Sequence, residues 1–289
     1  MSHLRFPLLL LLALAALAAG CGDDDGSSEE SSSSEETVSL DDCTPDQLET
    51  VADGTLTVAT DSPAFPPYFE DDDPTNGEGF ESAVAYAVAS TLGFDEGDVK
   101  WVVEPFNSSY APGPKDFDFD VNQISITPKR AEQVDFTEPY YTAKQAVVAL
   151  KDSDAAGATS LGDLADAKIG VQIGTTSQEA VEASIQPTED PQVFDTSNDV
   201  VSALKNGQVD AVVVDVPTAF YLTAVQVTDA TTVGQFAAPG GDEWGALLAK
   251  DSPLTDCVSA AITELSDSGE LAEIEQTWIA DKTNAPVIE

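Results

Sequence analysis

Short β-rich blocks and blocks of helical periodicity alternate along the chain from about residue 55 to residue 279. The run TLTVAT at 55–60 is typical of a strand, whereas the apolar residues Phe80, Val84, Val88 and Leu92 recur at helical spacing. The same criteria predict strands at 100–104, 121–126, 145–150, 168–173, 192–194, 209–214 and 244–249, and helical segments at 128–133, 178–185, 198–206, 253–265 and 270–279. This alternation predicts an α/β fold with mostly parallel sheets flanked by helices.

The patterned region is long enough to predict two lobes. Its length of about 245 residues is more than one hydrophobic core usually serves. Two segments precede apolar strands and fit crossings between lobes, PYYT at 139–142 and PGG at 239–241. We therefore expect lobe 1 to comprise residues 43–142 and 242–289, lobe 2 to comprise residues 143–241, and a two-strand hinge to join them.

The first 20 residues have the pattern of an export signal. A short basic start precedes an apolar run at 6–19, which is too short to span a bilayer comfortably. The residues LAAGC at 17–21 resemble the lipobox of bacterial lipoproteins, although Ala18 stands where Leu is commonest. The resemblance implies cleavage after residue 20 and acylation of Cys21, which would anchor the exported protein to the outer face of the bacterial cell membrane.

Residues 22–42 consist almost entirely of Gly, Ser, Asp and Glu, so they cannot bury enough apolar area to offset the entropy of ordering. We interpret residues 21–42 as a flexible tether behind the anchor, with an acidic interaction tail as the alternative. The two cysteines that remain, Cys43 and Cys257, are predicted to form a disulfide because the protein is exported. Two unrelated buried thiols are the alternative.

The charge and the histidine count exclude several classes of function. The chain has 53 acidic residues against 11 Lys and Arg, whereas nucleic-acid binding needs basic clusters. Such acidity resembles proteins of salt-loving organisms. The only histidine is His3, in the signal segment, so His-based catalysis and His-ligated metal sites are not expected, and we predict no cofactor. The acids at 70–73 are read as solvated surface, with a calcium loop as the alternative.

Four ordered stretches carry a family resemblance. They read GTLTVATD at 54–61 with FPPY at 65–68, GFE at 79–81, SITPKR at 125–130 with VDFTEPYY at 134–141, and KIGVQIGTT at 168–176 with GQVDAVVVD at 207–215. In order and spacing they resemble the family-3 extracellular solute-binding proteins, the polar amino-acid receptors of ABC importers. The resemblance covers nearly all of residues 54–279. It implies a type II periplasmic-binding fold whose lobes close on a small ligand.

Arg130 is the strongest candidate for a binding residue. It is the only arginine after residue 20, and it follows a predicted strand end, where open α/β sheets bind ligands. Its forked guanidinium would grip the α-carboxylate of the substrate, and Ser125 offers a hydroxyl in the same turn. The alternative is surface pairing of Arg130 with Glu132 or Asp135.

Lobe 2 is expected to supply the opposite side of the site. Thr175 and Thr176 stand between a predicted strand and a helix, where N–H groups and hydroxyls suit an anion. Asp215 ends another strand, at the position that pairs with the substrate ammonium in the family. For the two threonines and for Asp215, capping of the helix that follows is the alternative.

A pocket for the ligand side chain is implied at Asp61, Phe65 and Tyr68, with core packing as the alternative for the two aromatic residues. The chain departs from the family pattern after GFE, where Ser and Ala replace a further acid two residues on. It also departs from the pattern before Ser125, where the family often has small residues and this chain has Asn and Gln. Both amides, Asn122 and Gln123, are expected to alter the pocket floor.

Taken together, these features predict a monomeric, lipid-anchored substrate-binding protein that delivers a polar or basic L-amino acid to an ABC permease. No second arginine is available for an acidic side chain, which disfavours acidic amino acids. We expect no enzymatic activity and assign no catalytic residue. The alternatives are another small zwitterion such as an ectoine-like solute or an opine, a sensory receptor, and a dehydratase-type lyase on the same fold.

Overall fold

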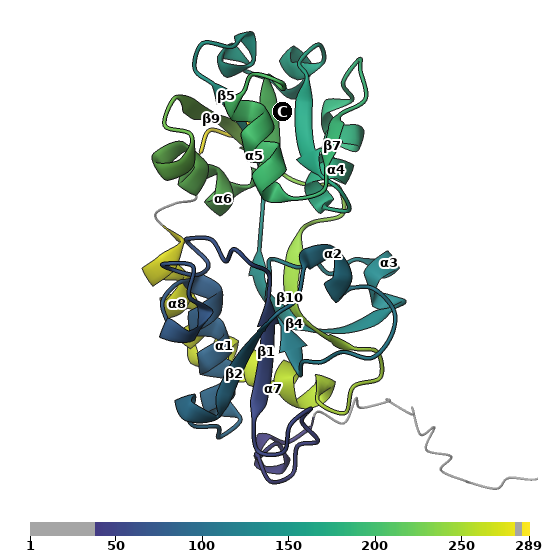
Figure 1. The fold of residues 1–289 in the computed structure, drawn as a ribbon, viewed down its shortest axis with the longest axis vertical. Coiled ribbons are helices and arrows are strands. Elements are labelled where there is room, and N and C mark those ends of the chain that lie inside the picture. Colours follow the sequence, from purple (N-terminus) through teal and green to yellow (C-terminus); the bar gives the residue numbers. More distant parts are fainter. Residues whose placement is uncertain (1–37, 281–284) are drawn as a thin grey trace, which may run out of the picture. The chain divides into compact units, whose positions relative to one another are not determined.

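The structure is a computed structural model that describes residues 38–280 and 285–289. The predicted signal segment, Cys21 and most of the predicted tether lie outside the described residues. Two five-stranded sheets organise the described part, and each is flanked by helices (Figure 1). Two separate sheets confirm the two-lobed α/β prediction. Each sheet is mixed: four of its strands run in the same direction and one, β10 in the first sheet and β5 in the second, runs antiparallel to both of its neighbours, which agrees with the prediction of mostly parallel sheets.

The sheet of lobe 1 has the strand order β2-β1-β3-β10-β4. Its strands are β1 (Leu56–Thr60), β2 (Val99–Val103), β3 (Phe119–Asp120), β4 (Val134–Thr142) and β10 (Glu243–Ala249), and its helices are α1 (Phe80–Thr91), α2 (Phe106–Ser109), α3 (Pro128–Ala131), α7 (Thr255–Ser268) and α8 (Glu270–Trp278). The strand predicted at 121–126 is wrong. β3 ends at Asp120, and Gln123 adopts a φ of 50°, which extended backbone cannot accommodate.

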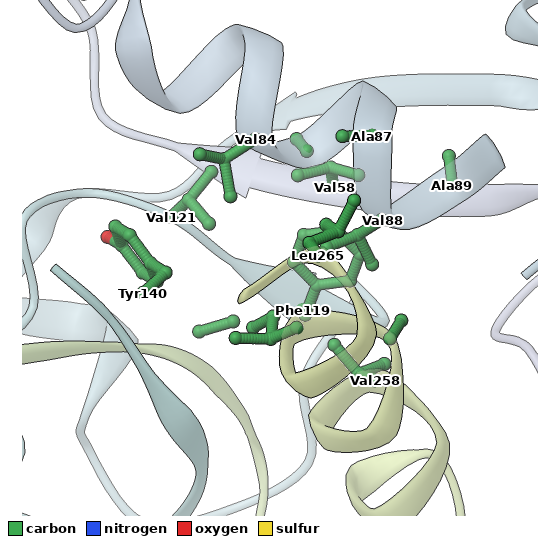
Figure 2. Packing of buried hydrophobic residues seen from close by; sticks show 14 of the residues in the cluster. Val58, Val84, Ala87, Val88, Ala89, Phe119, Val121, Tyr140, Val258 and Leu265 are labelled. Atoms are coloured by element: carbon green, nitrogen blue, oxygen red, sulfur yellow. The ribbon is translucent and has the colours of Figure 1, made fainter. Parts of the chain in front are cut away.

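Helices α1 and α7 cover one face of this sheet with a continuous apolar cluster. Figure 2 shows Val84 and Val88 of α1 gathered with Val258 and Leu265 of α7 over Phe119 of the sheet. The apolar residues whose spacing predicted helix α1 are therefore the residues through which this helix packs in the core. In addition, Cys43 and Cys257 form a disulfide, which ties the start of the described chain to α7.

The sheet of lobe 2 has the order β7-β6-β8-β5-β9. Its strands are β5 (Gln145–Leu150), β6 (Ile169–Gln172), β7 (Gln192–Phe194), β8 (Ala211–Asp215) and β9 (Ala230–Phe236), and its helices are α4 (Thr176–Ala180), α5 (Ser197–Lys205) and α6 (Val216–Tyr221). Successive β5 residues alternate between two apolar clusters, with Val147 in one and Val148 in the other, because side chains of a strand point to opposite faces. The threonine-rich β9 was not predicted.

The chain crosses between the sheets at 143–144, after β4, and at 237–242, after β9. The two crossing segments are joined by a hydrogen bond from the Ala143 N–H to the Asp242 carbonyl, 2.7 Å. The PYYT segment at 139–142 forms the end of β4, directly before the first crossing, and the PGG segment at 239–241 lies within the second crossing.

The last five residues require a correction to the predicted lobe boundaries, which assigned all of 242–289 to lobe 1. Residues 285–289 pair with β9 of lobe 2, where Gln235 bonds to Pro286 and Ile288 through the backbone. Ile288 is buried in a lobe 2 cluster, over Gly234, where an added Cβ would lie 2.6 Å from the Ile288 side chain. The chain end thus packs on the other lobe because β9 offers it an open edge and a notch.

Candidate functional site

A cavity of about 440 Å³ is lined by residues of both lobes. Most of its polar residues directly follow the carboxyl ends of β1, β6, β7 and β8, the edge at which open α/β sheets bind ligands. All nine residues predicted to bind substrate line this cavity: Asp61, Phe65, Tyr68, Gln123, Ser125, Arg130, Thr175, Thr176 and Asp215. Their proximity follows from the fold; that they bind a ligand stays a prediction.

Arg130 lies on α3, whose first turn is capped by the Thr127 hydroxyl. Its guanidinium donates to the carbonyls of Ser125 at 2.7 Å and of Gly174, in the opposite lobe, at 2.9 Å. It also stacks against Tyr110, with 4.7 Å between the guanidinium carbon and the ring centroid. Burial lowers the pKa of Arg130. The group is thus held rigidly at the cavity wall, and two of its five N–H donors are used.

No carboxylate neutralises Arg130 directly. Among the residues that the structure describes, the only ion pair within 4 Å joins Lys250 and Asp135 at 2.9 Å. Asp135 therefore pairs elsewhere, and Arg130 is 7% exposed, so surface pairing of Arg130 does not occur. A buried cation without an adjacent anion is costly, and a bound anionic group would lower that cost.

Asp215 lies on the lobe 2 side of the cavity, at the end of β8. It precedes α6, but its side chain makes no capping hydrogen bond, so the capping alternative is not seen. Instead it accepts from Gln145 Nε2 at 2.7 Å, and the same nitrogen donates to Asp242 at 2.6 Å. Burial first, and the charge of Asp242 second, raise the pKa of Asp215 well above its usual range. A cationic group of a ligand beside these two carboxylates would lower the pKa of Asp215, because its charge would offset both the burial of Asp215 and the repulsion from Asp242.

The two threonines that begin α4 have different roles. Thr175 is the N-cap, and its hydroxyl oxygen accepts from Gln178 N at 3.2 Å, so the capping alternative holds for this residue. Thr176 reaches across the cavity instead. Its hydroxyl lies 3.3 Å from Ser125 Oγ of lobe 1 and donates to Asp242 at 3.1 Å.

The first wall of the cavity combines core and site residues. Asp61 accepts from the Ser62 and Phe106 N–H groups at 2.7 and 3.2 Å, and so orders the loop after β1. Phe65 lies 6.3 Å from Tyr221 of lobe 2 between ring centroids. Tyr68 packs in the lobe 1 core, which is the alternative role considered for it above. Its hydroxyl nevertheless shares a 2.9 Å hydrogen bond with the Thr218 hydroxyl of lobe 2.

Gln123 lies at the cavity floor in the left-handed backbone region, with φ 50°. Its N–H donates to the buried carboxylate of Glu81 at 2.7 Å, and its side-chain amide nitrogen donates to the other oxygen of that carboxylate. Tyr140 donates a third hydrogen bond to Glu81, 2.5 Å.

Sequence reasoning missed several cavity neighbours. Gln145 is the first residue of β5, directly after the first crossing, and Asp242 ends the second crossing. Their side chains are joined by a hydrogen bond across 97 positions of the sequence, which no local pattern indicates. Asp195 follows β7 and lines the cavity, so its position at a predicted strand end was a usable signal. Phe106 lines the cavity close to the end of β2, and its ring lies 5.4 Å from the Arg130 guanidinium.

Two features are absent from the residues that the structure describes, a metal-binding cluster of side chains and a membrane-spanning helix. No group of three or more His, Cys, Asp or Glu side chains could hold a metal ion there, which includes the acids at 70–73. Within the same ranges, each helix is too short or too polar to cross a membrane.

The comparison with protein families identifies the chain. Residues 56–281 match the model of the bacterial extracellular solute-binding proteins, family 3. The chain belongs to this family. The match spans both sheets and every cavity-lining residue discussed above, so the family assignment covers the site as well as the fold.

Individual relatives agree with the family assignment. The chain is 31% identical over 216 residues to the arginine-binding extracellular protein ArtP of Bacillus subtilis (strain 168), covering 73% of this chain and 81% of ArtP. Among solved structures, an ancestral arginine-binding protein bound to glutamine matches with a TM-score of 0.65 and 31% identity, over 78% of this chain and 97% of that one. The fold is thus of the type II periplasmic-binding kind.

A third match is relevant to the enzyme alternative. The ancestral amino acid-binding protein AncCDT-1, described as a precursor of cyclohexadienyl dehydratase, matches with a TM-score of 0.62 and 28% identity, over 78% of this chain and 94% of that one. It is itself named as a binding protein, as are the other two. An amino-acid-binding protein is therefore what these similarities support.

Proposed function

We propose that this protein is the substrate-binding component of an ABC importer and that it captures a polar or basic L-amino acid between its lobes. The observation that carries the proposal is the pair of opposite charges in one cavity. Arg130 is a buried cation without a carboxylate partner, and Asp215 belongs to a pair of carboxylates with a single amide between them. An α-carboxylate and an α-ammonium would satisfy both sides at once.

The lining of the cavity favours a cationic side chain on the ligand. Arg130 is the only basic residue in the lining, whereas Asp61, Asp195 and Asp215 are acidic. Once the backbone groups of the ligand are paired with Arg130 and Asp215, two carboxylates are left over. They would attract a guanidinium or ammonium group and repel an acidic side chain. The arginine named in the relatives fits this charge balance.

Closure of the two lobes around the ligand would be the signal that the protein is loaded. Arg130, Ser125 and Tyr68 of lobe 1 already contact lobe 2, and a ligand touching both lobes would stabilise that arrangement. A permease could then distinguish loaded from empty protein by its shape.

Titration calorimetry with the common L-amino acids tests the proposal. Arg130→Ala and Asp215→Ala should each weaken binding by about 30-fold or more, because truncating one partner of a buried charge pair costs about 2–5 kcal/mol. Lys129→Ala is the matched control, since Lys129 is the exposed neighbour of Arg130. Undiminished affinity in both cavity variants would reject the site, and a folded chain that binds no amino acid would reject the function.

Export and anchoring through Cys21 are part of the same proposal, supported by the lipobox-like LAAGC at 17–21. Cys21→Ser should move the protein from the membrane fraction to the soluble fraction of cells that express it. Unchanged membrane association would remove the anchor from the proposal. Uptake of a radiolabelled amino acid, lost on deletion of the gene, would separate transport from a purely sensory role.

The acidic composition supports adaptation to high salt. The formal net charge is −42, so carboxylates repel one another across the surface. Counterions screen this repulsion, and the melting temperature should rise between low and molar salt. A constant or falling melting temperature would contradict this idea.

A further inference from the structure

Glu81 is a buried carboxylate that lies beside the cavity without lining it. It occupies the first turn of α1 and is 0% exposed. Gly79 fixes where this helix begins, because an added Cβ would lie 2.4 Å from the Tyr68 carbonyl oxygen. The Glu81 N–H also donates to that carbonyl, 3.0 Å. Its position is therefore set by the backbone of the adjacent loop.

Most of the hydrogen bonds that the Glu81 carboxylate accepts within the described residues come from one residue, Gln123. Gln123 donates to Glu81 Oε1 through its backbone N–H and to Oε2 through its side-chain amide, while Tyr140 donates to Oε1. Two bonds to the same residue fix both its backbone and its side chain. This matters because Gln123 holds a φ of 50°, a left-handed conformation that costs a residue with a Cβ about 1–2 kcal/mol.

Gln123 itself lines the cavity, so Glu81 acts on the cavity through it. The amide nitrogen of Gln123 is turned toward Glu81, and within the described residues no group donates to its amide oxygen. The oxygen is thus the hydrogen-bonding group that remains available. A carbonyl oxygen accepts hydrogen bonds from ammonium, guanidinium and amide N–H groups, and has nothing to offer an apolar side chain.

We propose that Glu81 is a positioning residue that holds Gln123 so that its amide oxygen is left for a hydrogen-bond donor on the side chain of the ligand. The inference rests on the proposed function, since it needs an amino acid in this cavity. Its consequence is selectivity: ligands that carry a side-chain donor are preferred over ligands of the same length that lack one.

The test uses matched ligand pairs in calorimetry, L-lysine with L-norleucine and L-glutamine with L-methionine. The members of each pair are similar in length and differ in the side-chain donor. In the wild type, the donor-bearing member should bind more tightly. In Glu81→Gln, this ratio should shrink about tenfold, the value of about one neutral hydrogen bond, because a Gln side chain cannot accept from both nitrogens of Gln123. Glu78→Gln, an exposed glutamate three residues earlier, should leave the ratio unchanged.

A second variant separates positioning from a general loss of structure. Gln123→Gly removes the amide, and glycine adopts the left-handed conformation without strain. It should reduce the ratio by itself, and adding Glu81→Gln to it should reduce the ratio no further, since Glu81 then has nothing to position. This comparison remains informative if Glu81→Gln alone folds poorly, because Gln123→Gly reports on the same oxygen.

The outcomes distinguish the two proposals. If the folded wild-type protein binds no amino acid, the proposed function fails and this inference falls with it. If the wild type binds amino acids but Glu81→Gln weakens both members of each pair equally, only the positioning role is overturned. A further loss of selectivity on adding Glu81→Gln to Gln123→Gly would also overturn it.

Discussion

The two lobes share one architecture but bury very different side chains. Lobe 1 buries the charged residues Glu81, Asp118, Asp120 and Arg130, and Asp242 at the end of the second crossing is buried as well, whereas the described part of lobe 2 buries no Asp, Glu, Lys or Arg to the same extent. The lobe 2 sheet is instead enclosed by Val, Ala, Ile and Leu clusters on both faces. Lobe 1 therefore carries most of the buried charge, whereas each lobe contributes two charged residues to the cavity lining, Asp61 and Arg130 from lobe 1 and Asp195 and Asp215 from lobe 2.

The buried acids of lobe 1 are not equivalent. Asp118 accepts from the Val51 and Thr57 N–H groups at 2.7 and 2.6 Å, so it organises backbone. Asp120 has no partner at either oxygen within the described residues, and burial raises its pKa well above the usual range. The buried acids of lobe 1 thus include one that is hydrogen-bonded, Asp118, and one that has no hydrogen-bond partner among the described residues, Asp120. We therefore expect the stability of lobe 1 to depend on pH more than that of lobe 2.

The largest expected effect concerns the covalent link that only lobe 1 has. Replacing Cys43 and Cys257 by Ser should lower the free energy of unfolding by about 3–5 kcal/mol, because the bond closes a loop of 214 residues. Urea denaturation followed by fluorescence measures this loss. A reducing agent should destabilise the wild type similarly and leave the double variant unaffected.

A similar loss is expected in lobe 2 from a single apolar side chain. Ile288→Ala should cost about 2–5 kcal/mol, since Ile288 is 4% exposed in the cluster that the chain end completes. The same urea experiment applies, and the loss should not vary with pH. Val287→Ala is the control, because Val287 is 65% exposed and should change stability by less than about 0.5 kcal/mol. Equal effects of both would mean that the tail does not pack as described.

A pH-dependent effect is expected from Glu81 in lobe 1. Burial raises the pKa of Glu81 to about 7 from 4.5. The folded state therefore binds this proton more tightly than the unfolded state, so the contribution of Glu81 to stability is fully present below pH 4.5 and is lost as the pH rises to about 7. The loss should be about 2–3 kcal/mol.

Glu81→Gln isolates this contribution. Asp118, Asp120 and Asp215 also have raised pKa values and still titrate in the variant, so the difference between the two unfolding free energies reports on Glu81 together with the effect of its charge on Asp120 and Asp215. That difference should change between pH 4.5 and pH 7.5 and be flat above. Parallel curves for wild type and variant would show that Glu81 does not titrate in this range.

The smallest effect is expected at the surface of lobe 1. Lys250 and Asp135 form an ion pair, but the Lys250 side chain is 45% exposed. Lys250→Ala should therefore lower the free energy of unfolding less than any of the losses predicted above, and molar salt should abolish the difference. A loss comparable to that of Ile288→Ala would show that charge at the surface matters as much as packing.

Local patterns indicated many of the residues that line the cavity, because these residues follow strand ends. Arg130 and Asp215 were found from their own surroundings in the chain, and the structure brings both to one cavity. The strand predicted at 121–126 was wrong for the opposite reason. The pattern there is that of a strand, and only the bond between Gln123 and Glu81, 42 positions away, accounts for its left-handed turn.

The sequence by itself determined the alternation of strands and helices, the two crossings, the ordered motifs of the family and the residue types of the site. These are properties of a residue and its near neighbours, set by side-chain periodicity and backbone preference. Only the tertiary structure decided that Gln145 bridges Asp215 and Asp242, that Glu81 holds Gln123, and that residues 285–289 pack on lobe 2. Such pairings depend on how crossings bring distant segments together, and the periodicity of one segment carries no record of the partner that it meets.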